Sequence, residues 1–123
     1  MIPYSVYKIV HLVGILMVFT ALGGLIANAI GQQAKTHAWR KPIAITHGVG
    51  LLLALVGGFG LLARLGVAHN GLPGWIYAKL GIWLVFGALL GVVARKPEMA
   101  KGIWVVIVLL GGLAAYLAGS KPF

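Results

Sequence analysis

The sequence predicts an all-α integral membrane protein, a four-helix bundle with up-down-up-down topology. Of its 123 residues, 61% are hydrophobic and only 9% are charged, whereas a soluble domain is about half apolar and about a quarter charged. A chain this short leaves much of its surface exposed, so a water-soluble fold could not bury that much apolar surface. Four long apolar segments, separated by short polar breaks, make up most of the chain.

Each apolar segment is long enough to cross a bilayer, because a hydrocarbon core of about 30 Å needs roughly 20 residues of helix. We expect one transmembrane domain over residues 1–123, with spans at Tyr4–Ala29, Ile43–Leu65, Trp75–Ala94 and Gly102–Gly119. The breaks contain Pro or Gly and are short, which makes successive helices antiparallel neighbours. We expect the first segment to be a true span rather than a signal peptide, because Lys8 and His11 interrupt its apolar stretch.

The distribution of lysine and arginine predicts the orientation. Six of these residues lie in the first and third breaks or beside them, and four lie on the other side: Lys35, Arg40, Lys41, Arg95, Lys96 and Lys101 against Lys8, Arg64, Lys79 and Lys121. By the positive-inside rule, the first and third breaks are cytoplasmic. We therefore expect a multi-pass protein of the cell inner membrane with both termini extracytoplasmic.

Membrane topology also explains the formal charge of +9. The cations sit at the ends of apolar runs, so membrane topology accounts for most of them and the expected partner is the lipid bilayer, not nucleic acid. The chain has no cysteine, which excludes disulfides, thiolate metal sites and thiol catalysis.

Small residues recur at four-residue spacing inside the spans. Gly87 and Gly91 form a GxxxG pair, and similar rows run through Gly50–Ala54–Gly58 and Gly111–Ala115–Gly119. In lipid, such rows let helix backbones approach closely. Packing within the bundle is the first interpretation, and a homodimer interface or a slot for a flat ligand are the others.

Several cations are predicted to gather at one membrane face. Lys8 and His11 are three residues apart and share a face of the first span. From the helical rise, Lys8 lies about 7 Å and His11 about 12 Å below Pro3, and Lys79 lies about 6 Å below Trp75. The same side also receives Arg64 from the second span and Lys121 after the fourth.

Two interpretations of this cluster stay open. Long lysine and arginine stems can snorkel to the interface, and a buried neutral histidine can bond to a backbone carbonyl. The other interpretation is an anionic ligand whose charged end meets the lysines. Haem b or another porphyrin fits, because its propionates favour cations, its ring is apolar and flat, and its iron binds imidazole. His11 is then the metal ligand, and Lys8, Arg64, Lys121 and His47 are further candidates for holding the cofactor.

His47 is the second candidate ligand, on the stripe His47, Gly50, Ala54, Gly57, Leu61 and Arg64, which steps by three and four residues. However, His11 and His47 enter from opposite sides, and their depths differ by about 12 Å. Lys79 lies nearly level with His11 and is the better second axial candidate. His37 and His69 fall in the breaks and are expected to be solvated.

The amino-acid composition of the spans excludes several other kinds of functional site. The spans contain no Asp or Glu, which removes carboxylate antiport, a rotary proton ring and a di-iron bundle. No histidine pair has the spacing of a zinc site, and no glycine-rich run ends as a phosphate loop does.

Three short motifs stand at the start of the first span, at the start of the third span and at the end of the chain: Tyr7-Lys8-Ile9-Val10-His11, Trp75-Ile76-Tyr77-Ala78-Lys79-Leu80 and Lys121-Pro122-Phe123. Together they resemble the HemJ-type membrane protoporphyrinogen oxidases and, more coarsely, the related SirB-type and CopD-type membrane proteins. The resemblance implies a helical membrane protein that binds haem b and oxidises protoporphyrinogen IX. It implies that His11 is a haem ligand and that Lys79 is functional, as a ligand or in proton handling. After the first span, the arginine- and tyrosine-containing stretch expected of the family is replaced by Gly23–Asn28.

The function expected from the sequence is haem-b binding, with redox chemistry on haem or porphyrin. If the chain is an enzyme, it is an oxidoreductase of the protoporphyrinogen oxidase type with Lys79 as the catalytic residue. The alternative is a small accessory or structural subunit, or an anion-handling channel or carrier without a cofactor. Because the spans offer few polar residues for a pore, the accessory role ranks above the channel.

Overall fold

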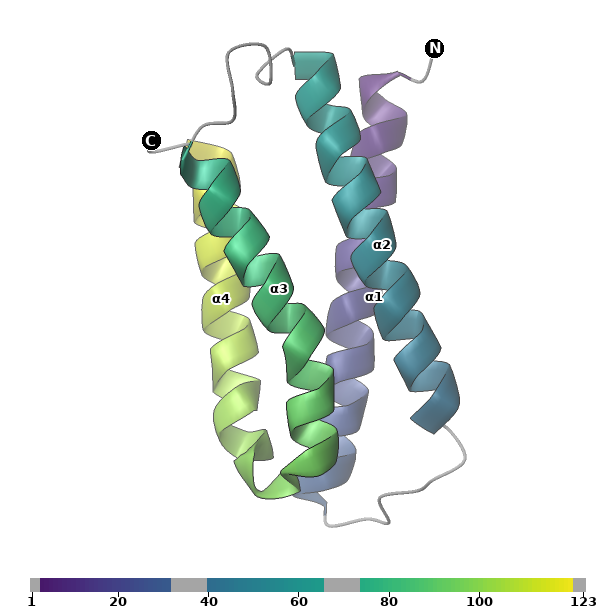
Figure 1. The fold of residues 1–123 in the computed structure, drawn as a ribbon, viewed down its shortest axis with the longest axis vertical. Coiled ribbons are helices and arrows are strands. Elements are labelled where there is room, and N and C mark those ends of the chain that lie inside the picture. Colours follow the sequence, from purple (N-terminus) through teal and green to yellow (C-terminus); the bar gives the residue numbers. More distant parts are fainter. Residues whose placement is uncertain (1–2, 32–39, 66–73, 121–123) are drawn as a thin grey trace.

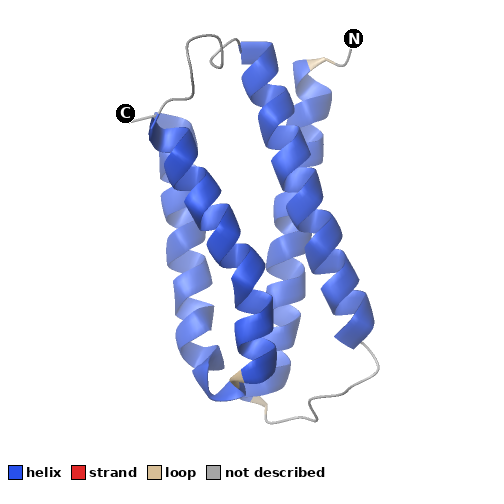
Figure 2. Ribbon diagram, in the orientation of Figure 1, coloured by secondary structure: helices blue, strands red, loops and turns tan. Residues whose placement is uncertain are grey.

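The computed structural model describes residues 3–31, 40–65 and 74–120 of the chain. Four antiparallel helices form the bundle: α1 (Tyr4–Ile30), α2 (Arg40–Leu65), α3 (Gly74–Arg95) and α4 (Ala100–Ser120), with the short 3₁₀ helix η1 (Pro97–Met99) before α4 (Figure 1). Within these ranges, residues outside helices are few (Figure 2). The predicted all-α, up-down-up-down bundle is confirmed.

All four long helices can cross a membrane by length and composition. The shortest, α4, has 21 residues, which corresponds to about 32 Å of helix and matches a hydrocarbon core of about 30 Å. Large apolar side chains face outward on every helix, for example Leu16, Leu52, Leu84 and Leu109. Such a surface is stable in lipid, so the chain is a multi-pass membrane protein.

Two boundaries, the starts of α2 and α4, differ from the sequence prediction by more than one residue. α2 begins at Arg40 rather than at Ile43, because Pro42 lies in the first turn, where a helix needs no backbone N–H from it. The predicted break Arg95–Lys101 is almost entirely helical: α3 runs to Arg95, η1 follows Lys96, and α4 begins at Ala100.

α1 and α2 form the most closely packed pair of helices. A Cβ atom added to Gly14 would collide with the Ala54 nitrogen, and one added to Gly50 would lie 2.8 Å from the Gly14 oxygen. Contacts this short leave no space for a side chain, so glycine is what permits the backbones to meet. The row Gly50–Ala54–Gly58 therefore packs within the bundle.

The other two small-residue rows face elsewhere. Gly111, Ala115 and Gly119 line a cavity inside the bundle. Gly87 and Gly91 are exposed, and a Cβ on Gly91 would meet nothing within 4 Å. A homodimer through a glycine-rich face stays a prediction, and among the described residues this outward-facing pair is one surface for it.

Two hydrogen bonds and one ring contact are among the contacts that join the helix pair α1–α2 to the helix pair α3–α4. The His47 Nε2 atom donates to the Phe86 carbonyl at 3.0 Å, and the Trp83 Nε1 atom donates to the Leu51 carbonyl at 2.9 Å. The rings of Phe19 and Phe86 meet edge to face, with centroids 5.1 Å apart. These contacts lie near the middle of the helices.

The two ends of the bundle differ. We call the end with Ile30, Lys41, Arg95 and Ala100 the closed end, and the fully buried core side chains Leu22, Ile26 and Val93 lie toward it. At the opposite end, which we call the open end, the two helix pairs diverge (Figure 1). Exposed cations mark the closed end: Lys41, Arg95, Lys96 and Lys101.

Candidate ligand cavity

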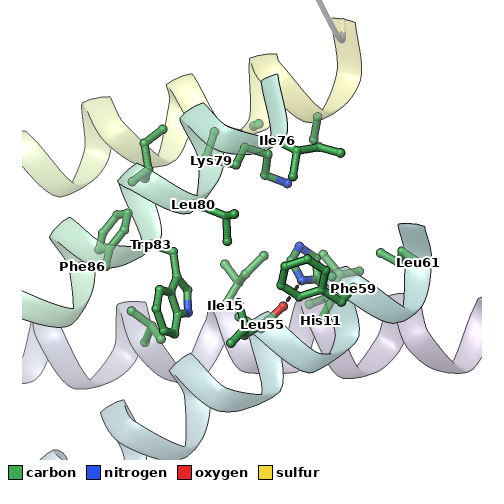
Figure 3. A pocket seen from close by; sticks show the side chains of 18 of the residues that line it. His11, Ile15, Leu55, Phe59, Leu61, Ile76, Lys79, Leu80, Trp83 and Phe86 are labelled. Atoms are coloured by element: carbon green, nitrogen blue, oxygen red, sulfur yellow. Dashed lines mark hydrogen bonds between the residues drawn. The ribbon is translucent and has the colours of Figure 1, made fainter. Parts of the chain in front are cut away.

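A cavity of about 610 Å³ lies between the two helix pairs, from the open end to the middle of the bundle (Figure 3). On α1 its lining runs from Tyr4 to Phe19, which corresponds to about 22 Å of helix. All four helices contribute to the lining, and most of the lining side chains are apolar. Its volume falls within the range of about 300–1,000 Å³ typical of small-molecule sites.

His11 provides an imidazole on the wall formed by α1 and α2. Its Nδ1 atom lies 2.7 Å from the carbonyl oxygen of Ala54. A carbonyl only accepts, so Nδ1 carries the hydrogen and Nε2 of the neutral ring keeps its lone pair. The ring extends from α1 into the cavity, on the side that faces Lys79 (Figure 3).

Two neighbouring glycines of α2 leave the space that His11 occupies. A Cβ atom on Gly57 would lie 2.5 Å from the His11 backbone nitrogen, and one on Gly58 would lie 3.3 Å from the ring atoms Nδ1 and Cε1. Gly57 thus lets the α1 backbone approach, and Gly58 leaves room for the ring. The bond to a backbone carbonyl that the sequence left open for His11 is present, and ligating histidines commonly donate their second nitrogen in this way.

Lys79 lies on the opposite wall. It comes from α3, is half-buried, and its side chain extends toward His11 (Figure 3). Lys8, one turn before His11 on α1, also lines the cavity and is exposed. The structure therefore brings Lys8, His11 and Lys79 around one cavity, with two amines and one imidazole in an otherwise apolar lining.

The deep end of the cavity is apolar and aromatic. Phe19 and Phe86 form its floor, and Trp83, which is hydrogen-bonded to the Leu51 carbonyl, stands beside them. On α4, the small residues Gly111, Ala114, Ala115, Ala118 and Gly119 make a nearly flat wall. A flat apolar ligand fits between this wall and the α1–α2 pair better than a branched one.

The remaining candidates are placed differently. His47 is only 3% exposed, donates Nε2 to Phe86, and does not line the cavity. The α2 stripe that begins at His47 mostly packs against α1, since Gly50 and Gly57 contact that helix directly. Arg64 belongs to the last turn of α2, but its side chain lies outside the described part. Lys121, His37 and His69 also lie outside the described residues.

Sequence reasoning missed Trp83 and the aromatic floor. Trp83 follows Lys79 by four residues on α3, so the two share a helix face. The stripe Tyr4, Lys8, Leu12, Ile15 and Phe19 carries the same kind of signal on α1. Steps of three and four residues along each helix, starting from Lys8 and Lys79, would have predicted both sets of lining residues.

The cavity does not offer a bare metal ion a complete set of ligands. Among residues 3–31, 40–65 and 74–120, no three His, Cys, Asp or Glu side chains come together. A single imidazole suits an iron that already has four ligands from a macrocycle. Comparison with known protein families, curated proteins and solved structures gives no match.

Proposed function

We propose that this multi-pass membrane protein binds haem b, and that His11 is the residue that would hold its iron. The observation that carries the proposal is the oriented imidazole: its Nδ1 atom is held by Ala54 at 2.7 Å, and its ring lines a cavity of about 610 Å³. A metal-binding histidine needs this arrangement, in which one nitrogen fixes the ring and the other is left for the metal.

The rest of the lining suits a porphyrin. The macrocycle is flat and apolar, and the cavity is bounded by the α1–α2 pair on one side and by small α4 residues on the other. Lys8 and Lys79 supply the positive charge that two propionates favour. Lys79 also stands opposite His11, where its amine would be a second group that could hold the iron or accept a proton from the bound molecule.

We further propose redox chemistry on haem or porphyrin, of the protoporphyrinogen oxidase type. Two of the motifs that resemble the HemJ-type family, Tyr7–His11 of α1 and Trp75–Leu80 of α3, each contribute residues to this cavity. Bound haem would supply a one-electron iron centre. The chain's own part is to hold the iron through His11 and to present the Lys79 amine to the ligand.

Absorption spectroscopy tests the binding proposal. Protein purified in mild detergent from haem-replete cells should show a Soret band. His11→Ala should lose the band, and His69→Ala, which removes a histidine of the second break, should keep it. A colourless wild-type protein that also fails to take up added hemin would refute the proposal and favour an accessory subunit.

Complementation tests the enzyme proposal separately. The wild-type chain should rescue growth of a strain that lacks protoporphyrinogen oxidase. A wild type that shows a Soret band but does not rescue would limit the function to haem binding.

A further inference from the structure

The helix pairs α1–α2 and α3–α4 are joined in the middle and at the closed end. The bonds from His47 to Phe86 and from Trp83 to Leu51 lie there, as does the contact between the Phe19 ring and Gly111 of α4. Beyond Phe19 and Gly111, toward the open end, both α1 and α4 contribute residues to the lining of the cavity.

One side of the cavity is incompletely covered. On α1, Lys8 and Leu12 line the cavity although both are exposed, and Leu12 is 48% exposed. On α4, Ala115 and Gly119 also line the cavity and are exposed. We call the gap between these two pairs of residues the α1–α4 window. On the other side, Leu55, Leu80 and Trp83 are half-buried and Phe59 is the one exposed residue among the described α2 and α3 lining.

The window faces lipid, not water. Leu12 lies eight residues inside α1, about 12 Å below the start of the helix, and α1 with 27 residues is longer than the hydrocarbon core requires. Opening an apolar cavity toward lipid carries no hydrophobic penalty, because acyl chains are as apolar as the lining. The helix backbones keep their own hydrogen bonds, so a wider window exposes no unpaired polar group.

We propose that the cavity exchanges its ligand sideways with the bilayer, through the α1–α4 window. The inference rests on the proposed function and specifies its ligand: a membrane-dissolved, flat amphiphile with an anionic end. The small side chains of Ala115 and Gly119 let such a molecule pass edgewise. Lys8, at the corner of the window nearest the open end, meets the anionic end as it enters.

Cross-linking tests this route, because the chain has no cysteine and introduced thiols are therefore unique. The double variant Leu12→Cys/Ala115→Cys is joined across the window by a short bismaleimide. A second double variant, Phe59→Cys/Leu80→Cys, is joined in the same way across the opposite side. Each variant labelled with a monofunctional maleimide is its own control.

The assay follows hemin entry in lipid. Apoprotein in lipid nanodiscs is mixed with hemin-loaded vesicles, and the Soret band and tryptophan quenching report loading. We expect the protein cross-linked across the window to load far less hemin than its own monofunctional control, whereas the protein cross-linked between residues 59 and 80 should load as much hemin as its own monofunctional control. When hemin is loaded first and the window is cross-linked afterwards, the spectrum should persist and apomyoglobin should no longer extract the hemin.

The outcomes separate the two proposals. A wild type that never loads hemin would overturn the proposed function and this route together. A wild type that loads, together with a window-cross-linked protein that loads equally well, would overturn only the route. Loss of loading confined to the cross-link between residues 59 and 80 would also overturn it, since entry would then occur between α2 and α3.

Discussion

Replacing Gly57 with alanine is expected to displace His11 by forcing α1 away from α2. The added Cβ would lie 2.5 Å from the His11 backbone nitrogen and 2.7 Å from its Cα atom. Since non-bonded heavy atoms settle at about 3.5–4 Å, α1 must move by about 1 Å. The bond between His11 Nδ1 and Ala54, 2.7 Å long, would then exceed hydrogen-bonding distance.

The cost of this change can be estimated from its two parts. Overpacking of this kind costs about 1–3 kcal/mol, and an interhelical hydrogen bond in a membrane contributes about 0.6–1.7 kcal/mol. The free energy of unfolding should therefore fall by about 1.6–4.7 kcal/mol. Hemin affinity should fall as well, because the imidazole loses the bond that orients it.

Two other glycines of α2 provide graded controls. A Cβ on Gly58 would lie 3.3 Å from the His11 ring, and a Cβ on Gly48 would meet nothing within 4 Å. Gly58→Ala should shift the Soret band with little loss of stability, and Gly48→Ala should leave both unchanged or slightly raise stability. Unfolding in mixed detergent micelles, followed by circular dichroism, measures the series. A Gly57→Ala protein as stable as wild type would refute the reasoning.

Three further predictions concern Lys79, the His47 bond and the orientation. Lys79→Arg should leave expression and helicity intact but change the haem spectrum or abolish porphyrinogen oxidation, because a guanidinium stays protonated and cannot ligate iron; an unchanged spectrum and activity would make Lys79 a snorkelling anchor. His47→Phe removes the bond to Phe86 and should cost about 0.6–1.7 kcal/mol of stability while the Soret band remains; loss of the band in a stably folded variant would instead make His47 a ligand. Reporter fusions at Phe123 should behave as exported, and an active cytoplasmic reporter there would contradict the predicted orientation.

The fold was predictable because few backbone structures are stable inside a bilayer. A backbone in lipid must satisfy its own hydrogen bonds, so a long apolar run becomes a helix. The predicted spans agree with α1 to α4 to within three residues at each described boundary. The largest difference, at the start of α2, arises because Pro42 is compatible with a first turn.

The site was predictable only in part, because the hydropathy pattern does not determine how each helix is rotated about its own axis. His11 and His47 both stand in apolar helices, yet only His11 lines the cavity, whereas His47 is bonded to the Phe86 carbonyl. The close approach of Gly14 and Gly57 to the facing backbones sets how α1 and α2 are turned relative to each other. The spacing of small residues identifies such glycines, but it does not predict which residue of the neighbouring helix each one contacts.

Chemical rescue of His11 is the most direct test of whether its imidazole holds the haem iron. His11→Gly removes the imidazole and leaves a void beside Gly58, next to the cavity. The purified variant should lack the Soret band of the wild type, and added imidazole should restore it, because free imidazole can occupy the void and bind the iron. A His11→Gly protein that keeps the wild-type spectrum without imidazole would show that His11 does not hold the iron.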